Sequence, residues 1–274
     1  MLYLKSILAV LFIVITVSGC CLQTPQPNFS QSTLMNKTEA VFSFSVIALF
    51  AHPDDETWIS GTLATLAARG VQVTPVYVTS GDAGSDHSGQ GLTGVELASV
   101  RESEARQATA ILGLNSPIFL RFPDGKIIQY EQEVKGKLTT LVKKNSPKIM
   151  LTFARGGITD NRDHKALNAL VSEHFSTLAA YFAVSQSQAE ILALSASKFD
   201  LNYRIARPVA DADISIKLDV AGYQAQRVRA MASHKTQFPP VMIQAYQDYA
   251  EASPREALMG MSESQFIIFQ TTLD

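Results

Sequence analysis

The residues best suited to chemistry in this sequence stand close together: His52, Asp54, Asp55 and Glu56. Imidazole and carboxylate groups together are ligands that zinc and similar divalent ions take in proteins. A structural alternative is that these side chains cap a helix, because acidic residues are favoured in a first helical turn. The residues on either side of the group indicate where it lies in the fold.

The group follows residues 46–50, an apolar run that is too short for a typical helix. Such a run predicts a parallel strand that is buried on both faces. Residues 57–69 come next, with apolar residues at helical spacing and Gly70 as a stop signal. In an open α/β sheet, ligands bind in the crevice beyond the carboxyl ends of the strands. We therefore expect the histidine and the acids in that crevice.

A second polar stretch, residues 161–164, also lies at a predicted strand-to-helix crossover. His164 would open the helix beside Asp163. Taken alone, an Asp-His pair favours helix capping. Together with His52 and Asp55, however, His164 would supply the third protein ligand of an open zinc site.

Strands and helices are expected to alternate along most of the chain. We predict strands at residues 46–50, 71–78, 118–122, 148–153, 189–195, 214–220 and 266–271. We predict helices at residues 57–69, 95–112, 131–144, 165–182 and 221–236. In the second helix, Arg101 and Glu104 are spaced to form an ion pair. The alternation favours right-handed βαβ units and thus an α/β fold with a mostly parallel sheet.

The N-terminal segment reads as a targeting sequence. Residues 1–19 have the charge, the apolar run and the small residues of a signal peptide, and the run is shorter than the ~20 residues that span a bilayer. Residues 17–20 resemble a bacterial lipobox, in which Cys20 would be lipidated; cleavage without a lipid is the alternative. We expect residues 20–39 to be a flexible tether and residues 40–274 the folded domain. The expected location is the bacterial cell envelope, lipid-anchored at a periplasmic or surface face, with a secreted soluble form as the alternative.

Composition excludes several classes of function. Both cysteines precede residue 40, so the folded domain has no disulfide scaffold, thiol nucleophile or cysteine metal site. The formal net charge of −2 gives no basic footprint, and no nucleic-acid partner is expected.

Several motifs resemble those of the PIG-L/LmbE-like zinc N-deacetylases. They occupy residues 51–56, 101–105, 122–125, 162–164 and 234–237, in the order of the family. The resemblance implies a Rossmann-like three-layer α/β domain. It also implies that a zinc ion, or another divalent metal, is held by His52, Asp55 and His164, with Asp54 as general base.

The second motif departs from the family pattern. The family commonly has a histidine that helps to stabilise the tetrahedral intermediate where this chain has Asn161. Asn161 can donate a hydrogen bond to an oxyanion but cannot carry a proton or a charge. Either Asn161, Arg155 or Arg162 stabilises the intermediate, or activity is reduced.

The same resemblance suggests further site residues. Asp163 is a candidate to orient the adjacent histidine or a neighbouring group. Candidates for substrate binding are Arg101, Asp124 and His234. The expected function is removal of an N-acetyl group from an N-acetylglucosamine-type sugar or glycoconjugate. The alternatives are a zinc amidase for a non-sugar amide and a non-catalytic glycan-binding lipoprotein, although the latter has no need of Asp54.

Overall fold

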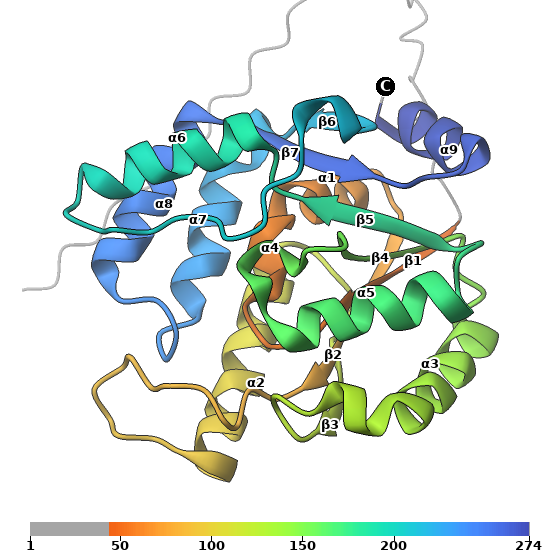
Figure 1. Cartoon of the computed structure of the whole chain (residues 1–274), viewed down its shortest axis with the longest axis horizontal. Helices are drawn as coiled ribbons and strands as arrows, with labels where there is room; N and C mark the ends of the chain where they lie inside the picture. The colour runs from red at the N-terminus through yellow and green to blue at the C-terminus, as the bar shows by residue number, and fades with distance from the viewer. Residues whose placement is uncertain (1–43, 274) are drawn as a thin grey trace, which may run out of the picture. The chain divides into compact units, whose positions relative to one another are not determined.

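A computed structural model describes residues 44–273, and within these residues seven strands form one sheet (Figure 1). The strands are β1 (Ser45–Phe50), β2 (Gln72–Thr79), β3 (Ile118–Phe122), β4 (Ile149–Phe153), β5 (Ala179–Ala183), β6 (Ile216–Asp219) and β7 (Arg255–Met259). Their order across the sheet is β3-β2-β1-β4-β5-β7-β6. Strands β1 to β5 are parallel, and β7 runs antiparallel to both of its neighbours.

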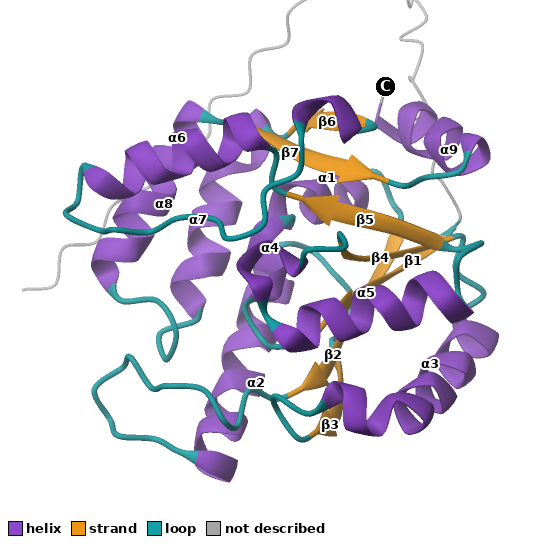
Figure 2. Ribbon diagram, viewed as in Figure 1, coloured by secondary structure: helices purple, strands orange, loops and turns teal. Residues whose placement is uncertain are grey.

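Helices cover both faces of the sheet (Figure 2). They are α1 (Ser60–Ala68), α2 (Gly94–Ile111), α3 (Glu131–Asn145), α4 (Gly157–Asp160), α5 (Arg162–His174), α6 (Gln186–Ser197), α7 (Gln224–Ser233), α8 (Pro240–Ala252) and α9 (Glu263–Leu273). Helices α3 and α5 lie on one face and α1 and α2 on the other, as right-handed crossovers require. Helix α7 packs on α1 and α2, and α8 packs on α6 and α7. The predicted three-layer α/β fold with a mostly parallel sheet is confirmed.

Strand β1 is the centre of the core. Its residues 46–50 have no exposed surface, and it pairs with β2 on one side and β4 on the other. The chain first builds the sheet from β1 towards β3 and then returns to add β4 and β5. The carboxyl ends of β1 and β4 therefore border the topological switch point, where such sheets bind ligands.

The first half of the chain matches the predicted elements, and the second half differs. The predicted helix over 165–182 is wrong, because α5 ends at His174 and residues 179–183 form β5. The predicted strands at 189–195 and 266–271 are also wrong, since they lie inside helices α6 and α9. Helix α8 and strand β7 were not predicted.

Side chains at the helix starts explain two of these errors. Ser185 and Gln188 form a capping box at the start of α6, in which each side chain bonds the backbone N–H of the other residue. Ser262 and Gln265 do the same at the start of α9. Strand β5 contains three alanines, which favour helix, but its pairing with β4 and β7 overrides that preference.

The predicted ion pair between Arg101 and Glu104 does not form. Both side chains are buried, and each binds other groups. Arg101 donates to the backbone carbonyls of Gly81 and Ser85, 2.8 and 2.9 Å away. Glu104 accepts from the backbone N–H and the hydroxyl of Thr236. These two residues therefore connect α2 to loops instead of to each other.

The N-terminal predictions concern residues that the structure does not describe. The signal peptide, Cys20 and the tether all lie outside residues 44–273. Within that range, no helix is both long and apolar enough to cross a lipid bilayer.

Candidate metal centre and active site

Three predicted ligands lie together at the carboxyl ends of β1 and β4. His52 is in the turn after β1, and Asp55 begins the short 3-10 helix η1 (Asp55–Trp58). His164 lies in the first turn of α5, which the chain enters after β4. Although more than a hundred residues separate His52 from His164, the switch point places them side by side.

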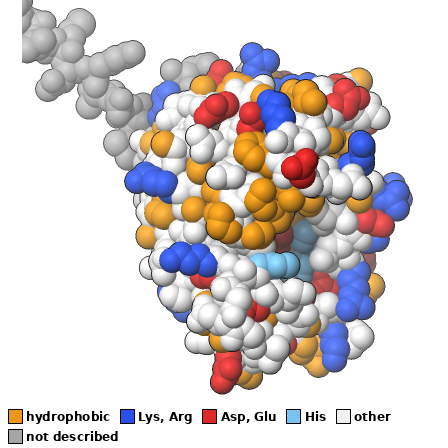
Figure 3. All heavy atoms as spheres, turned by 90° about the vertical axis from the view of Figure 1, so that its left-hand side faces the viewer, with side chains coloured by type: hydrophobic (Ala, Val, Ile, Leu, Met, Phe, Trp, Pro, Cys, Tyr) orange, Lys and Arg blue, Asp and Glu red, His pale blue; other side chains and the backbone are white. Residues whose placement is uncertain are grey.

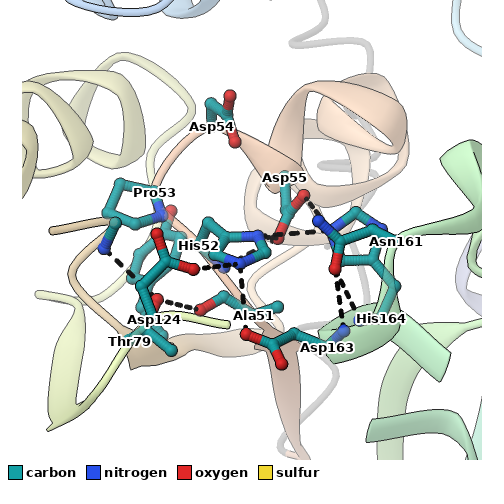
Figure 4. Close-up of polar contacts among 12 residues, drawn as sticks. Ala51, His52, Pro53, Asp54, Asp55, Thr79, Asp124, Asn161, Asp163 and His164 are labelled. Atoms are coloured by element: carbon teal, nitrogen blue, oxygen red, sulfur yellow. Dashed lines mark hydrogen bonds and ion pairs between the residues drawn. The ribbon is translucent and has the colours of Figure 1, made fainter. Parts of the chain in front are cut away.

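The ligand atoms of these residues converge on one point (Figure 4). His164 Nε2 lies 3.0 Å from Asp55 Oδ1 and 3.3 Å from His52 Nδ1. His52 Nδ1 lies 3.4 Å from the other Asp55 oxygen. One ligand atom from each residue lies within 4.8 Å of the other two. Two imidazoles and one carboxylate suit zinc with a coordination position left for water or substrate.

The remaining ring nitrogens are held by other groups. His52 Nε2 lies 3.1 Å from Asp124 Oδ1, and His164 Nδ1 lies 2.9 Å from the carbonyl oxygen of Gly157. In the neutral form of each ring, a proton on these nitrogens leaves His52 Nδ1 and His164 Nε2 unprotonated towards the cluster. Histidines that bind metals are oriented in this way by a carboxylate or a carbonyl. The residues present therefore fit a divalent metal.

Close packing fixes the position of the His164 ring. Phe153, the last residue of β4, stacks on it with ring centroids 3.9 Å apart. Gly157 has φ of +65°, and a Cβ there would lie 2.7 Å from His164 Cβ. The close approach that brings its carbonyl to the ring thus requires glycine.

Burial and neighbouring charged groups shift the pKa values of Asp55 and His52. Burial opposes the charged form of Asp55, but His164 and then His52 hold the pKa of this carboxyl below its usual range. Burial acts to lower the pKa of His52, but hydrogen bonds to Asp124 and Asp163 raise it above its usual value. Asp55 is therefore an ionised carboxylate, as a metal ligand must be.

Asp54 lies beside the ligands and is not one of them. Figure 4 shows its carboxylate pointing away from the two imidazole rings. Its backbone has φ of 107°, an uncommon conformation for a residue other than glycine, and its N–H donates to Glu56 Oε2 at 3.1 Å. Burial, followed by the charge of Asp55, raises the pKa of Asp54 to about 8. Among residues 44–273, none donates a hydrogen bond to this carboxylate, which faces the pocket described below.

Asn161 has two separate roles available to it. Its Oδ1 accepts from the backbone N–H groups of Asp163 and His164, which makes it the N-cap of α5. Its Nδ2 has no hydrogen-bond partner among the described residues, and the side chain lines the pocket. The amide can therefore cap the helix and donate to a substrate at the same time.

Asp163 was predicted to orient His164 or a neighbouring group, and in the structure its carboxylate lies near His52. Its carboxylate accepts from the backbone N–H groups of Gly125 and Ile127, at 2.7 and 3.2 Å. One of its oxygens is 3.6 Å from His52 Nε2. Asp163 therefore supports the turn after β3 and the His52 ring, whereas the Gly157 carbonyl orients His164.

Comparison with known families and proteins agrees with this geometry. A family model described as GlcNAc-PI de-N-acetylase (PIG-L) matches residues 47–175, which include Asp54 and all three candidate ligands. Residues 47–175 of this chain are thus similar to the PIG-L family. The region from residue 47 to 175 is called the PIG-L region below.

Relatives that are named as deacetylases align over most of the chain. A 1D-myo-inositol 2-acetamido-2-deoxy-alpha-D-glucopyranoside deacetylase from Actinosynnema mirum is 27% identical, over 70% of this chain and 80% of its own. A probable N-acetyl-alpha-D-glucosaminyl L-malate deacetylase 2 from Bacillus anthracis is 25% identical, over 82% and 94%. The structure of N,N'-diacetylchitobiose deacetylase from Pyrococcus horikoshii has a TM-score of 0.58 at 21% identity, over 78% of this chain and 82% of that one. That similarity shows a shared fold.

The three predicted substrate contacts have different outcomes. Asp124 in the PIG-L region lines the pocket, although one of its oxygens is occupied by His52. Arg101 also lines the pocket, but its guanidinium is bound to the loop carbonyls. The prediction that His234 borders the pocket is wrong, since its side chain is fully buried and bonds to Glu56.

Glu56 is the residue whose role the sequence did not reveal. It has no exposed surface, and it accepts from the hydroxyl of Tyr77 at 2.8 Å and from the backbone N–H of Asp54. His234 binds its other oxygen. This buried cluster lies beneath the turn that carries the candidate base. Its position inside the first motif was the only signal in the sequence, because Tyr77 and His234 are far away along the chain.

A pocket of about 520 Å³ opens onto the metal centre. Around the ligands its wall is polar, with Asp124, Asn161 and Arg162. The opposite half of the wall is apolar and is contributed mainly by α6, α7, α8 and the segments next to them. Figure 3 shows this difference: hydrophobic side chains gather directly beside the hollow in which histidine is visible.

Proposed function

We propose that this protein is a metal-dependent deacetylase that removes the N-acetyl group from an N-acetylglucosamine-type sugar. The observation that carries the proposal is the convergence of His52, Asp55 and His164 beside a pocket-facing carboxylate, Asp54. Relatives that are named as deacetylases of such sugars support the substrate class.

The proposed metal is zinc, held by His52 Nδ1, one oxygen of Asp55 and His164 Nε2. When bound, such an ion supplies Lewis acidity, which polarises the amide carbonyl and makes water more acidic. Two imidazoles and a carboxylate are also the ligand set of several hydrolytic zinc sites, and other divalent metals can bind the same groups.

The side chains of the protein would move the proton and hold the charge. Asp54 accepts a proton from the attacking water and returns it to the amine that departs, so that water and the amide become acetate and the free amine. Asn161 Nδ2 donates to the oxygen that becomes negative in the transition state. Asp124 keeps the proton of His52 on Nε2, away from the metal.

Acetate release from a panel of N-acetylated sugars tests this proposal. The assay uses the protein with zinc, the protein with a chelator, and the variant Asp54→Asn, which keeps the shape of the side chain. We expect release that is lost with the chelator and in Asp54→Asn. Acetate release from non-sugar amides alone would mean that the protein is an amidase and not a sugar deacetylase. No acetate release from any amide would mean that it is not an enzyme of this class.

We also propose that the protein is anchored in the bacterial cell envelope by a lipid on Cys20. The support is the sequence of residues 1–20. The variant Cys20→Ser should lack lipid and move from the membrane fraction to the soluble fraction when cells are fractionated. If Cys20→Ser stays with the membranes, the lipid anchor is wrong.

A further inference from the structure

The pocket has an apolar half that the proposed reaction does not use. Side chains from three helices and two adjoining segments form its wall: Leu192, Leu201, Met231, Phe238, Met242 and Tyr246. Leu192 and Met231 are almost completely buried, and the others are half-buried at the pocket surface. This wall is continuous with the metal centre, because one pocket is lined by both.

Two polar side chains at or behind this wall are already bound to other groups. The hydroxyl of Tyr246 donates to the backbone carbonyl of Thr57 at 3.0 Å, so that its ring faces the cavity. The guanidinium of Arg227 lies over the same ring and pairs with Glu256 at 3.2 Å. Arg227 is buried and does not line the pocket, so no positive charge reaches the cavity from this side.

A sugar ring is a poor occupant for this half of the pocket. Its hydroxyl groups would leave water and find almost no hydrogen-bond partners on the wall, which is unfavourable. An alkyl chain or an aromatic ring has no hydrogen bonds to lose there, and the removal of its apolar surface from water is favourable. The sugar and its acetamido group are better matched to the polar half, which holds Asp124, Asn161 and Arg162.

The residues of the apolar wall also lie outside the PIG-L region in the sequence. The candidate ligands and Asp54 lie within residues 47–175, whereas the six wall residues named above lie between residues 192 and 246. The wall is therefore contributed by a part of the chain that lies outside the match to the family model.

We propose that the apolar half is a subsite for an extended alkyl group carried by the substrate, either on its acyl side or on its sugar side. This inference rests on the proposed function, because it extends the substrate of the same metal centre. Each methylene that enters the pocket should strengthen binding about fourfold.

Binding can be measured without catalysis, because Trp58 lines the pocket and is the only tryptophan of the chain. Its fluorescence is followed during titration with the methyl and octyl glycosides of N-acetylglucosamine, and with N-acetyl- and N-octanoylglucosamine. In at least one pair, the octyl or octanoyl compound should bind at least 100-fold more tightly, which is the gain for roughly three to four methylenes inside the pocket, and should shift the emission to shorter wavelength. The pair that responds identifies the side that carries the chain. Equal affinity within both pairs would reject the subsite.

Variants on two helices locate the effect. Met242→Gln and Leu192→Gln place an amide in the apolar wall with little change in size, and each should reduce the preference for the long chain at least tenfold. Leu194→Gln on the same helix as Leu192 is the matched control, because Leu194 is 63% exposed and does not line the pocket. It should keep the full preference. Melting curves of all three variants confirm folding, and an equal loss of preference in all three would contradict the inference.

The acetate-release panel separates this inference from the proposed function. A fluorescence response to long chains without hydrolysis of any amide would keep the subsite and reject the deacetylase. Hydrolysis of acetylated sugars without any preference for long chains would keep the deacetylase and reject the subsite.

Discussion

Each histidine of the metal centre directs one ring nitrogen to the metal site, and its other ring nitrogen is held by a second group of the protein. Asp124 holds His52, and the Gly157 carbonyl holds His164. Residue types suggested the three ligands, because imidazole and carboxylate at two crossovers match a zinc site, and the family resemblance assigned them. They did not predict these second groups, since a backbone carbonyl leaves no signal in the sequence.

At the same scale, Asn161 is expected to donate to the oxyanion. Asn161→Ser keeps a side-chain oxygen for the N-cap of α5 but lacks the amide donor. We expect kcat to fall roughly 100- to 1000-fold with little change in melting temperature. Asn161→Ala is the control, because it loses both roles and should also destabilise the fold by about 1 kcal/mol. An unchanged kcat in Asn161→Ser would show that another group, such as Arg162, stabilises the charge.

At the scale of elements, the sequence was most informative where its patterns are local. The buried run of β1 and the helical spacing of α2 are clear, and both elements form as predicted. Helices α6 and α9 were missed because their apolar runs also resemble strands. Each begins with Ser-x-x-Gln, the signal that could have identified it. Strand β5 has no such local signal, because only its neighbours in the sheet decide its conformation.

The capping box of α6 provides a test at this scale. Ser185→Ala removes the hydroxyl that accepts from the backbone N–H of Gln188, and should cost about 1 kcal/mol. In a domain of this size that corresponds to a melting temperature lower by roughly 2–4 °C. Gln186→Ala, one position along and exposed, is the control and should change little. Equal melting temperatures for the two variants would mean that the box does not stabilise α6.

At the scale of the whole molecule, the metal centre joins parts of the chain that are distant in sequence. His52 follows β1, and His164 follows β4, so a bound ion would link the two central strands of the sheet. The apolar wall adds the last third of the chain to the same pocket. Its helices could be predicted only in part from the sequence, which is why the apolar half of the pocket could not be predicted.

Metal binding is therefore expected to stabilise the entire domain. At free zinc about 100-fold above its dissociation constant, the gain is about 2.7 kcal/mol, or roughly 5–10 °C in melting temperature. Differential scanning fluorimetry with and without zinc measures it. Asp55→Ala removes a ligand and should abolish the rise. The same rise in that variant would place the stabilising ion elsewhere.

The most direct test of this account is the zinc content of purified Asp54→Asn and His164→Ala, measured together with acetate release. His164 is expected to hold the metal, and Asp54 to accept the proton. Asp54→Asn should therefore keep one zinc per chain and lose activity, whereas His164→Ala should lose both. Full zinc occupancy in His164→Ala, or full activity in Asp54→Asn, would contradict this account.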